Sequence, residues 1–317
     1  MIKWPAWVVV GALLLTACSA RDDKKIPPLS IGTDGQAVAY FPVGKTLCDL
    51  LGDGSSCKLA PADGPVQNLE SVHNGTPKLG IIRADALHRA WAGQPPFKTG
   101  MKKMRVLFTL HEEAVTLVAP GKAGATLFQN AHGKRLNVGP EGSDQERLVA
   151  DLFAACKNLL SDVVMSRLEA PELLPALRSH TLDGYFDVTG HPNYALAQAA
   201  LASRLEIVPI EGDCVTALVK AQPYFEPVAI PGKVYRGADQ DVTTVGVPFW
   251  VVANTEVDND LVYKVVRKVF ENVETLRQSN PVLHGLSPRK MLKSIAVPYH
   301  PGALKYYQEK RWFKAAS

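Results

Sequence analysis

Residues 135–160, RLNVGPEGSDQERLVADLFAACKNLL, contain a short strand pattern, a glycine-rich junction and an amphipathic helix pattern in direct succession. Residues 135–138 predict the strand, and the apolar spacing of residues 144–160 predicts the helix. Ser143 and Glu146 form an S-x-x-E capping box where this helix begins. A strand that turns at glycine into a helix is typical of α/β proteins, in which helices cover parallel sheets.

The same alternation of short apolar runs and amphipathic runs extends on both sides of this stretch. The expected strands cover residues 29–32, 79–82, 104–110, 115–119, 163–168, 182–188 and 205–210. The expected helices cover residues 43–51, 85–91, 171–180, 193–203 and 214–220. Because the strand pattern restarts at Arg135, two α/β units follow each other along the chain.

The last third of the chain is expected to return to the first unit. Residues 242–253 predict a long strand, and residues 258–278 predict an amphipathic helix that closes the unit. About 290 mature residues exceed the usual size of one compact core. We therefore expect two lobes, residues 30–118 plus 240–317 and residues 119–239, each with a mixed, mostly parallel sheet flanked by helices. A ligand cleft would lie between the lobes, and a hinge would close it.

Three strand-to-helix junctions contain glycine and are expected to face this cleft. Helix N-termini present unpaired N–H groups and a positive dipole end, which suits a carboxylate. In open α/β sheets these helix starts gather at the carboxyl edge of the strands. The junctions are Ile31-Gly32-Thr33-Asp34-Gly35, Val138-Gly139-Pro140-Glu141-Gly142-Ser143 and Val188-Thr189-Gly190-His191-Pro192.

The N-terminus predicts export and a lipid anchor. Lys3 precedes an uncharged, largely apolar run over residues 4–17, which is shorter than the roughly 20 residues that span a bilayer. Residues 15–18, LTAC, match a lipobox, so residues 1–17 are expected to be a signal peptide and Cys18 the lipidated cysteine. Residues 18–29 would be the tether of a periplasmic lipoprotein on the inner or outer membrane. An ordinary signal peptide and a membrane anchor are the alternatives.

Composition and cysteine content narrow the class further. A hydrophobic fraction of 46% and a charged fraction of 21% are those of a globular protein. The net charge of +4 is spread along the chain, which argues against a nucleic-acid partner. Cys48 and Cys57 flank a Gly- and Ser-containing turn, so we expect them to form a disulfide in an oxidising compartment. Cys156 and Cys214 remain, as a second pair or as buried thiols.

The junctions and several other motifs resemble the TAXI family of solute receptors, which serve tripartite ATP-independent periplasmic (TRAP) transporters. The resemblance covers roughly residues 30–312 and is most specific near the C-terminus. The further motifs are Tyr40, Val66-Gln67-Asn68-Leu69, Asp85, Glu113-Ala114-Val115, Asp183-Gly184-Tyr185-Phe186, Pro298-Tyr299-His300-Pro301-Gly302-Ala303, Tyr306-Tyr307 and Glu309. The resemblance implies a type II periplasmic-binding-protein fold that binds glutamate, 2-oxoglutarate or a similar small carboxylate. A TRAP membrane permease would be the partner.

The sequence departs from the TAXI pattern near the expected pocket. Gln36 and Ala37 replace a glycine pair, and Pro65 replaces a serine. Arg83 stands where a glutamine is usual, and Asp144-Gln145 stands in place of glycine and threonine. These departures imply an altered specificity, or a receptor that has become a sensor or interaction subunit.

The candidate ligand-binding residues come from the junctions and the TAXI motifs. They are Gly32, Thr33, Gly35, Tyr40, Asn68, Arg83, Asp85, Gly142, Ser143, Gly190, His191 and Pro192. These residues also have structural interpretations. Ser143 and Asp85 can be helix caps, and Tyr40 can be a core aromatic. Arg83 either clamps a solute carboxylate with two parallel N–H donors or pairs with Asp85. If it clamps the solute, Arg83→Met lowers the affinity.

The sequence contains no complete enzyme motif, so we expect a binding protein without catalytic residues, cofactor or metal. A G-x-S-x-G nucleophile elbow is absent, and cysteines and histidines lack the spacing of metal ligands. Residues 111–113, His-Glu-Glu, place carboxylates beside a histidine, but strand neighbours point to opposite faces. A noncatalytic sensor lipoprotein is the second hypothesis, and a lipid-anchored enzyme is a distant third.

Overall fold

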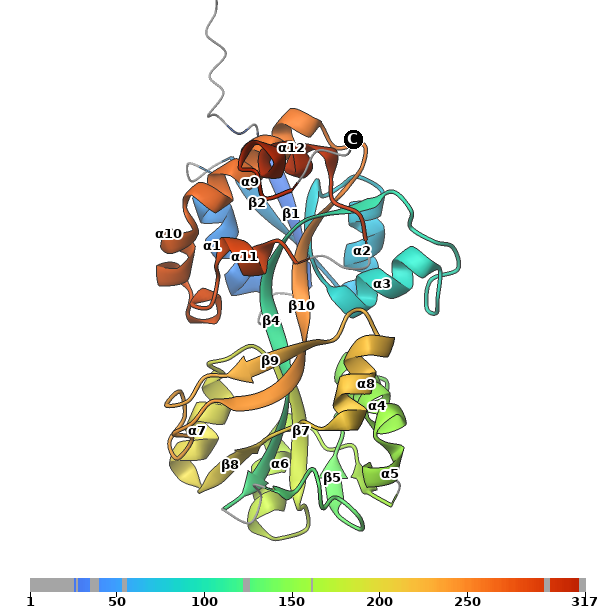
Figure 1. The fold of residues 1–317 in the computed structure, drawn as a ribbon, viewed down its shortest axis with the longest axis vertical. Coiled ribbons are helices and arrows are strands. Elements are labelled where there is room, and N and C mark those ends of the chain that lie inside the picture. Colours follow the sequence, from blue (N-terminus) through green and yellow to red (C-terminus); the bar gives the residue numbers. More distant parts are fainter. Residues whose placement is uncertain are drawn as a thin grey trace, which may run out of the picture.

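The computed structural model describes residue 26 and residues 28–34, 40–52, 56–121, 126–160, 162–293 and 297–313. The predicted signal peptide, Cys18 and the tether up to residue 25 lie outside the described residues, as does Gly35. Figure 1 shows two groups of helices and strands, one above the other, joined by two long strands. We call the upper group the first lobe and the lower group the second lobe.

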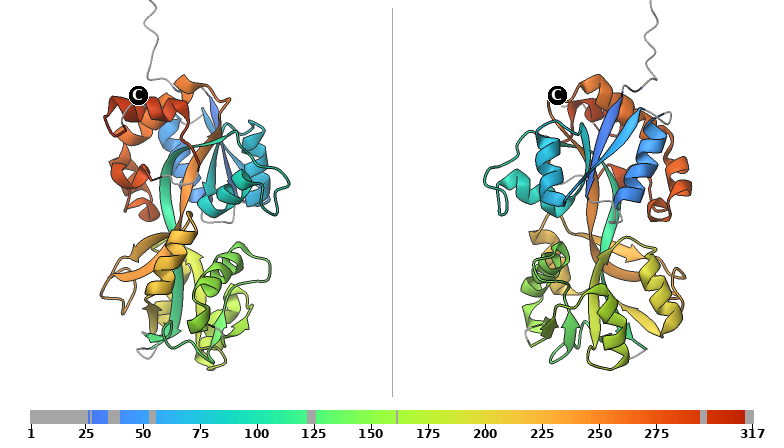
Figure 2. Two further views of the ribbon diagram at one scale, coloured as in Figure 1. Left: turned by 45° about the vertical axis from the view of Figure 1, so that its right-hand side comes forward. Right: turned by 180° about the vertical axis from the view of Figure 1, so that it is seen from behind.

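The first lobe contains elements from both ends of the chain (Figure 1). Its N-terminal elements are β1 (Leu29–Asp34), α1 (Tyr40–Leu51), β2 (Cys57–Ala62), α2 (Pro65–His73), β3 (Leu79–Arg83) and α3 (Ala84–Ala92). Its C-terminal elements are α9 (Asn259–Glu271), α10 (Val273–Ser279), the 3-10 helix η2 (Pro281–Leu283), α11 (Pro288–Met291) and α12 (Pro301–Glu309). Seen from behind in Figure 2, α1 and α2 lie on opposite sides of the strands of this lobe.

The second lobe is built from the middle of the chain. Its elements are β5 (Arg135–Asn137), α4 (Asp144–Ala155), α5 (Lys157–Leu160), β6 (Val164–Ser166), α6 (Ala170–Arg178), β7 (Gly184–Thr189), α7 (Tyr194–Ala202), β8 (Leu205–Val208), α8 (Asp213–Ala221) and β9 (Glu226–Ile230). The long strands β4 (Met104–Pro120) and β10 (Val242–Asn254) run through both lobes (Figure 1). Because each of them pairs in both lobes, the exact division at residues 118/119 and 239/240 stays a prediction.

Hydrogen bonds join the strands in the order β2-β1-β3-β10-β4-β7-β5-β6, with β8 on β4 and β9 on β10. Pairing is parallel among β2, β1 and β3 and among β6, β5 and β7. It is antiparallel wherever β4 or β10 takes part. Because three antiparallel pairings separate β3 from β7, these two strands run in opposite directions, and their carboxyl ends face each other across the cleft. The expected α/β fold with a cleft between two lobes is confirmed, but the strands of the described residues form one ten-stranded sheet through both lobes rather than a mostly parallel sheet in each.

Apolar side chains hold each lobe together. In the first lobe, Leu47 of α1, Val266 of α9 and Tyr307 of α12 are fully buried in one cluster against the sheet. A second cluster begins at α2 and α3 and continues along β4 and β10 to Leu148 of α4 and Leu218 of α8. This continuous apolar layer connects the lobes on the side of α3 and α4.

Several expected boundaries were wrong, each for a local reason. The strands predicted at residues 104–110 and 115–119 are one strand, because the polar residues 111–113 continue its pairing with β10. The helix predicted over residues 144–160 breaks at Cys156, and the one predicted over residues 258–278 breaks at Asn272. The strands β2 and β9 and the helices α2, α11 and α12 were not predicted.

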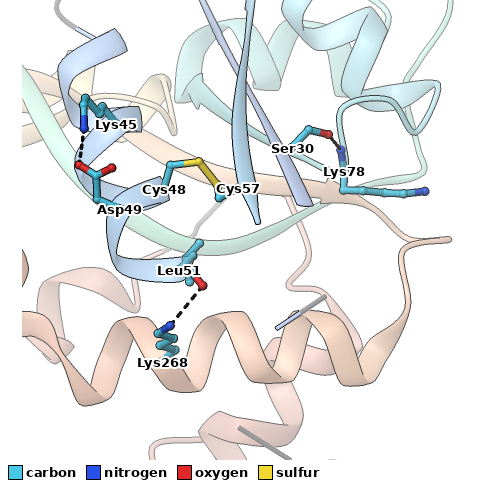
Figure 3. The surroundings of a disulfide bond; sticks show 8 residues. All are labelled: Ser30, Lys45, Cys48, Asp49, Leu51, Cys57, Lys78 and Lys268. Atoms are coloured by element: carbon cyan, nitrogen blue, oxygen red, sulfur yellow. Dashed lines mark hydrogen bonds and ion pairs between the residues drawn. A yellow bond between two sulfur atoms is a disulfide. The ribbon is translucent and has the colours of Figure 1, made fainter. Parts of the chain in front are cut away.

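Two disulfides link neighbouring elements. Cys48 of α1 is bonded to Cys57 at the start of β2, as predicted, and Figure 3 shows this bond beside the end of α1. There Lys268 of α9 donates a hydrogen bond to the carbonyl of Leu51, which satisfies an open acceptor of α1. Cys156 and Cys214, left open by the sequence, are also bonded and join the end of α4 to α8. Both bonds suit an oxidising compartment.

None of the helices in the described ranges is long and apolar enough to cross a membrane.

Candidate functional site

Charged side chains from both lobes meet on the α3 and α4 side of the cleft; we call them the Arg83 cluster. Arg83, the last residue of β3, donates from Nε to Oδ1 of Asp85 at 2.6 Å and from Nη2 to Oδ2 at 3.1 Å. Arg89 donates to the same Oδ2 at 2.7 Å. Asp85 is fully buried. Burial raises its pKa, but the charges and hydrogen bonds of Arg83 and Arg89 outweigh burial and hold the pKa of Asp85 at about 2.

The second lobe and the long strand β4 add two more carboxylates to this cluster. Asp144, the first residue of α4, places Oδ2 at 3.6 Å from Nη2 of Arg83. Glu113 of β4 places Oε2 at 3.9 Å from Nη1. Arg83 therefore forms ion pairs with three carboxylates, and its two parallel donors are bonded to Asp85. The pairing of Arg83 with Asp85 is observed, whereas contact between Arg83 and a solute stays a prediction.

The start of α4 is capped by its own chain. The Oγ atom of Ser143 accepts a hydrogen bond from the backbone N–H of Glu146 at 3.1 Å. The N–H of Gly142 donates to Oε2 of Glu146 at 2.7 Å, and Arg167 donates to Oε1 of the same carboxylate. The cap by Ser143 is thus confirmed, but the reciprocal bond of the predicted capping box does not form, because Glu146 accepts from Gly142 and the N–H of Ser143 donates to the carbonyl of Pro140. The N–H of Gly142 is already bonded to the carboxylate of Glu146, so a solute carboxylate would have to compete with Glu146 for this donor.

Two candidate residues, Gly32 of β1 and Asn68 of α2, contribute to the packing of α2 against the sheet. Asn68 of α2 donates from Nδ2 to Asp34 and to the carbonyl of Ile81, each at 3.2 Å. A Cβ atom on Gly32 would lie 2.3 Å from Oδ1 of Asn68, so only glycine lets α2 approach β1 this closely. Thr33 is fully buried, and its Oγ1 atom finds no partner among the described residues. The structure does not describe the side chain of Tyr40.

His191, at the end of β7, is bonded through both ring nitrogens. Nδ1 lies 2.6 Å from the hydroxyl of Tyr235, which also accepts from the N–H of Asn193 at 2.7 Å. The hydroxyl of Thr116 donates its proton to the carbonyl of Ala114, so it accepts from the ring and the proton of the neutral imidazole lies on Nε2; Nδ1 then accepts from the hydroxyl of Tyr235. Nε2 then donates to Oγ1 of Thr116 at 2.9 Å. Burial lowers the pKa of His191 to about 4, which agrees with this neutral tautomer.

On the other side of β4 and β10 the lobes enclose a cavity of about 300 Å³, which we call the His111 cavity. Segment 109–112 of β4 forms one wall, and β9, η2 and α11 contribute others. The candidates His191 and Pro192 line it. Gly190 meets the first lobe nearby, since a Cβ atom there would lie 3.0 Å from Val282 of η2. The polar run inside an apolar strand pattern was the signal for His111, which was not among the predicted site residues.

Two carboxyl groups and two lysines lie beside the His111 cavity. Lys293 pairs with Glu226 of β9 at 3.1 Å, and Lys290 pairs with Glu112 of β4 at 4.0 Å. Glu226 is buried, and both burial and the neighbouring Glu112 carboxylate raise its pKa. These pairs link α11 and the residues after it to the strands that enter the second lobe.

The two lobes, the two long strands between them and the enclosed cavity define the architecture of the periplasmic binding proteins. The chain belongs to the NMT1-like family, whose model matches residues 31–310.

Similar solved structures have low sequence identity, and the first of them shows the same fold. A TctC solute binding protein from Polaromonas is 11% identical, with 90% of this chain and 98% of that chain covered and a TM-score of 0.55. The second substrate-binding domain of GlnP from Lactococcus lactis, in an open conformation, is 10% identical, with coverage of 86% and 100% and a TM-score of 0.48. The aliphatic sulphonate binding protein SsuA from Escherichia coli is 11% identical, with coverage of 90% and 88% and a TM-score of 0.47.

Proposed function

We propose that this protein is an extracytoplasmic receptor that closes its two lobes on a small carboxylate and delivers it to a membrane permease. The His111 cavity carries the proposal, because both lobes build its walls next to the two strands that connect them. Concave, partly apolar pockets between lobes are where small solutes bind. Membership of the NMT1-like family and the fold shared with solute-binding proteins support a binding role rather than a catalytic one.

The motifs shared with TAXI receptors support a TRAP permease as the partner, and glutamate or 2-oxoglutarate as the first solutes to test. The ion pairs of Arg83 support the second hypothesis, a sensor or interaction lipoprotein. Asp144, which departs from the TAXI pattern, pairs with Arg83 inside the cleft. A solute carboxylate must displace it to reach that guanidinium.

Solute capture is expected to make the protein measurably more compact. Native mass spectrometry of protein purified without refolding would identify a co-purifying metabolite, and calorimetric titration would confirm its affinity. Small-angle scattering should then show a smaller radius of gyration with the solute, because the long strands allow the lobes to close as a hinge. Identical dimensions with and without a confirmed solute would contradict the closure.

The lipid anchor makes its own prediction. In Cys18→Ser the lipid cannot be attached, so the protein should move from the membrane fraction to the soluble periplasmic fraction. Ser19→Ala, which keeps the cysteine, is the control and should fractionate like the wild type. Unchanged membrane association of Cys18→Ser would exclude lipidation at Cys18.

A further inference from the structure

We propose that the His111 cavity is the solute pocket and that it selects a monocarboxylate with an aromatic or branched aliphatic body, with a polar oxygen bonded to His111. This inference rests on the proposed receptor function and specifies its solute.

The walls of the cavity favour an apolar body. Apolar side chains come from the strands of both lobes and from the segment after α10. They are Leu110, Val228, Ile230, Val234, Val282 and Leu286. A flexible dicarboxylate would lose water from both charged ends in such a pocket, whereas an aromatic or branched chain would bury apolar surface. The walls therefore discriminate against the polar solutes that the TAXI resemblance implies.

His111 supplies the polar contact that orients the solute. Its side chain is 7% exposed and stacks on Phe249, with ring centroids 4.7 Å apart and an interplanar angle of 6°. Within the described residues, its buried Nδ1 atom finds no hydrogen-bond partner. Buried polar groups in proteins are almost always paired, and leaving one unpaired costs free energy. A solute oxygen that bonds this imidazole removes that cost.

The protonation state of His111 allows it to donate a hydrogen bond to the solute. Burial lowers the pKa of His111 to about 4, so the ring is neutral near pH 7 and keeps one N–H donor. A neutral imidazole donates to a carboxylate or carbonyl oxygen without bringing a charge into the apolar pocket. His191, which also lines the cavity, uses both of its nitrogens within the second lobe. Of the two histidines of this cavity that are not exposed, His111 is thus the one with hydrogen-bonding capacity to offer, whereas the third, His284, is exposed.

Lys290 supplies the positive charge at the rim. It is half exposed, and its Nζ atom lies 4.0 Å from Oε2 of Glu112. Such a long contact is a weak pair, so a solute carboxylate can compete with Glu112 for the ammonium group. Glu112→Gln, which removes the competitor, should therefore strengthen solute binding. The guanidinium of Arg83 is less available to a solute, because Asp85, Asp144 and Glu113 already surround it.

Calorimetric titration of the mature chain tests the selectivity. The probes are phenylacetate and 4-methyl-2-oxopentanoate on one side, and 2-oxoglutarate and glutamate on the other. We expect the apolar-bodied probes to bind at least tenfold more tightly. Tighter binding of the dicarboxylates would overturn the pocket assignment while leaving the receptor function in place. If no small solute binds or co-purifies, the receptor function itself fails.

Variants locate the binding in the cavity. His111→Phe keeps the stacking on Phe249 but removes the hydrogen bond, and should weaken phenylacetate binding at least tenfold. His88→Phe is the matched control: its Nδ1 is also buried without a partner among the described residues, and its ring packs on Tyr224 outside the cavity. Its affinity should equal that of the wild type. Val282→Trp fills the cavity from the first lobe and should also abolish binding. Unchanged binding in either cavity variant would overturn the inference.

Discussion

Replacing Cys156 and Cys214 together by alanine is expected to lower the free energy of unfolding by roughly 4 kcal/mol, the loop-entropy value for their separation of 58 residues. The bond restricts the unfolded chain over that long loop. In the folded chain it ties the end of α4 to α8, where Cys156 is buried in the apolar layer that connects the lobes. Alanine, unlike serine, introduces no buried hydroxyl, so the measured loss of stability comes mainly from the missing cross-link.

The other disulfide is the matched control for this measurement. The separation of Cys48 and Cys57 is 9 residues, for which the same model gives about 2.5 kcal/mol. Urea unfolding of both double variants, followed by circular dichroism, gives the two losses side by side. Equal losses, or a larger loss for the short loop, would show that strain or local packing dominates over chain entropy.

The strand-and-helix alternation could be predicted because its signal is local. The predicted strands carry short runs rich in apolar residues, and the predicted helices that follow them repeat apolar residues at helical spacing. The breaks at Cys156 and Asn272 have no such signal, since the apolar spacing continues across both. Cys156 leaves the helix to form its disulfide with Cys214, which only the tertiary structure brings close.

The missed elements depend on neighbours that lie far away in the sequence. The strand β2, CKLAPA, carries a lysine and a proline and is only half buried at the edge of the sheet. The strand β9, EPVAI, pairs with β10 alone among the named strands. The helix α12 is capped by His300, whose Nδ1 accepts from the N–H of Gly302. A histidine cap in a proline- and glycine-containing segment is a weak sequence signal for a helix.

The sequence predicted where side chains gather better than what they contact. Arg83 pairs with Asp85 and with Asp144, which directly follows Gly142 and Ser143 in the sequence. The contacts of residues 111–113 in β4 could not be predicted from strand alternation. Strand alternation separates Glu112 from His111 and Glu113, but it does not show that all three have different partners: His111 stacks on Phe249, Glu112 pairs with Lys290, and Glu113 pairs with Arg83. These partners come from other segments and depend on the twist of two long strands.

Arg83→Met is expected to lower the free energy of unfolding by about 3–5 kcal/mol, the range for breaking one side of a buried ion pair. Asp85 is fully buried and would keep only Arg89 as its charged partner. The effect should depend on pH in a defined direction. With the pKa of Asp85 lowered from 3.8 to about 2, its contribution is present above pH 4 and is lost as the pH falls toward 2. The stability lost in Arg83→Met should therefore be largest above pH 4 and should shrink as the pH falls toward 2, because a protonated Asp85 no longer needs the guanidinium.

A double-mutant cycle separates this structural role from a role in solute binding. Asp85→Asn removes the buried charge, so Arg83→Met should cost much less in that background, and the two changes should not add. Arg277→Met is the surface control: its pair with Glu274 is exposed, and its loss should cost at most about 1 kcal/mol. If Arg83 instead clamps a solute carboxylate, Arg83→Met would leave urea unfolding unchanged and weaken solute affinity. We expect the loss of stability rather than the loss of affinity, because Arg83 already forms three ion pairs within the protein. Its guanidinium is neutralised by these carboxylates, so it stabilises the fold and is not free to attract a solute carboxylate.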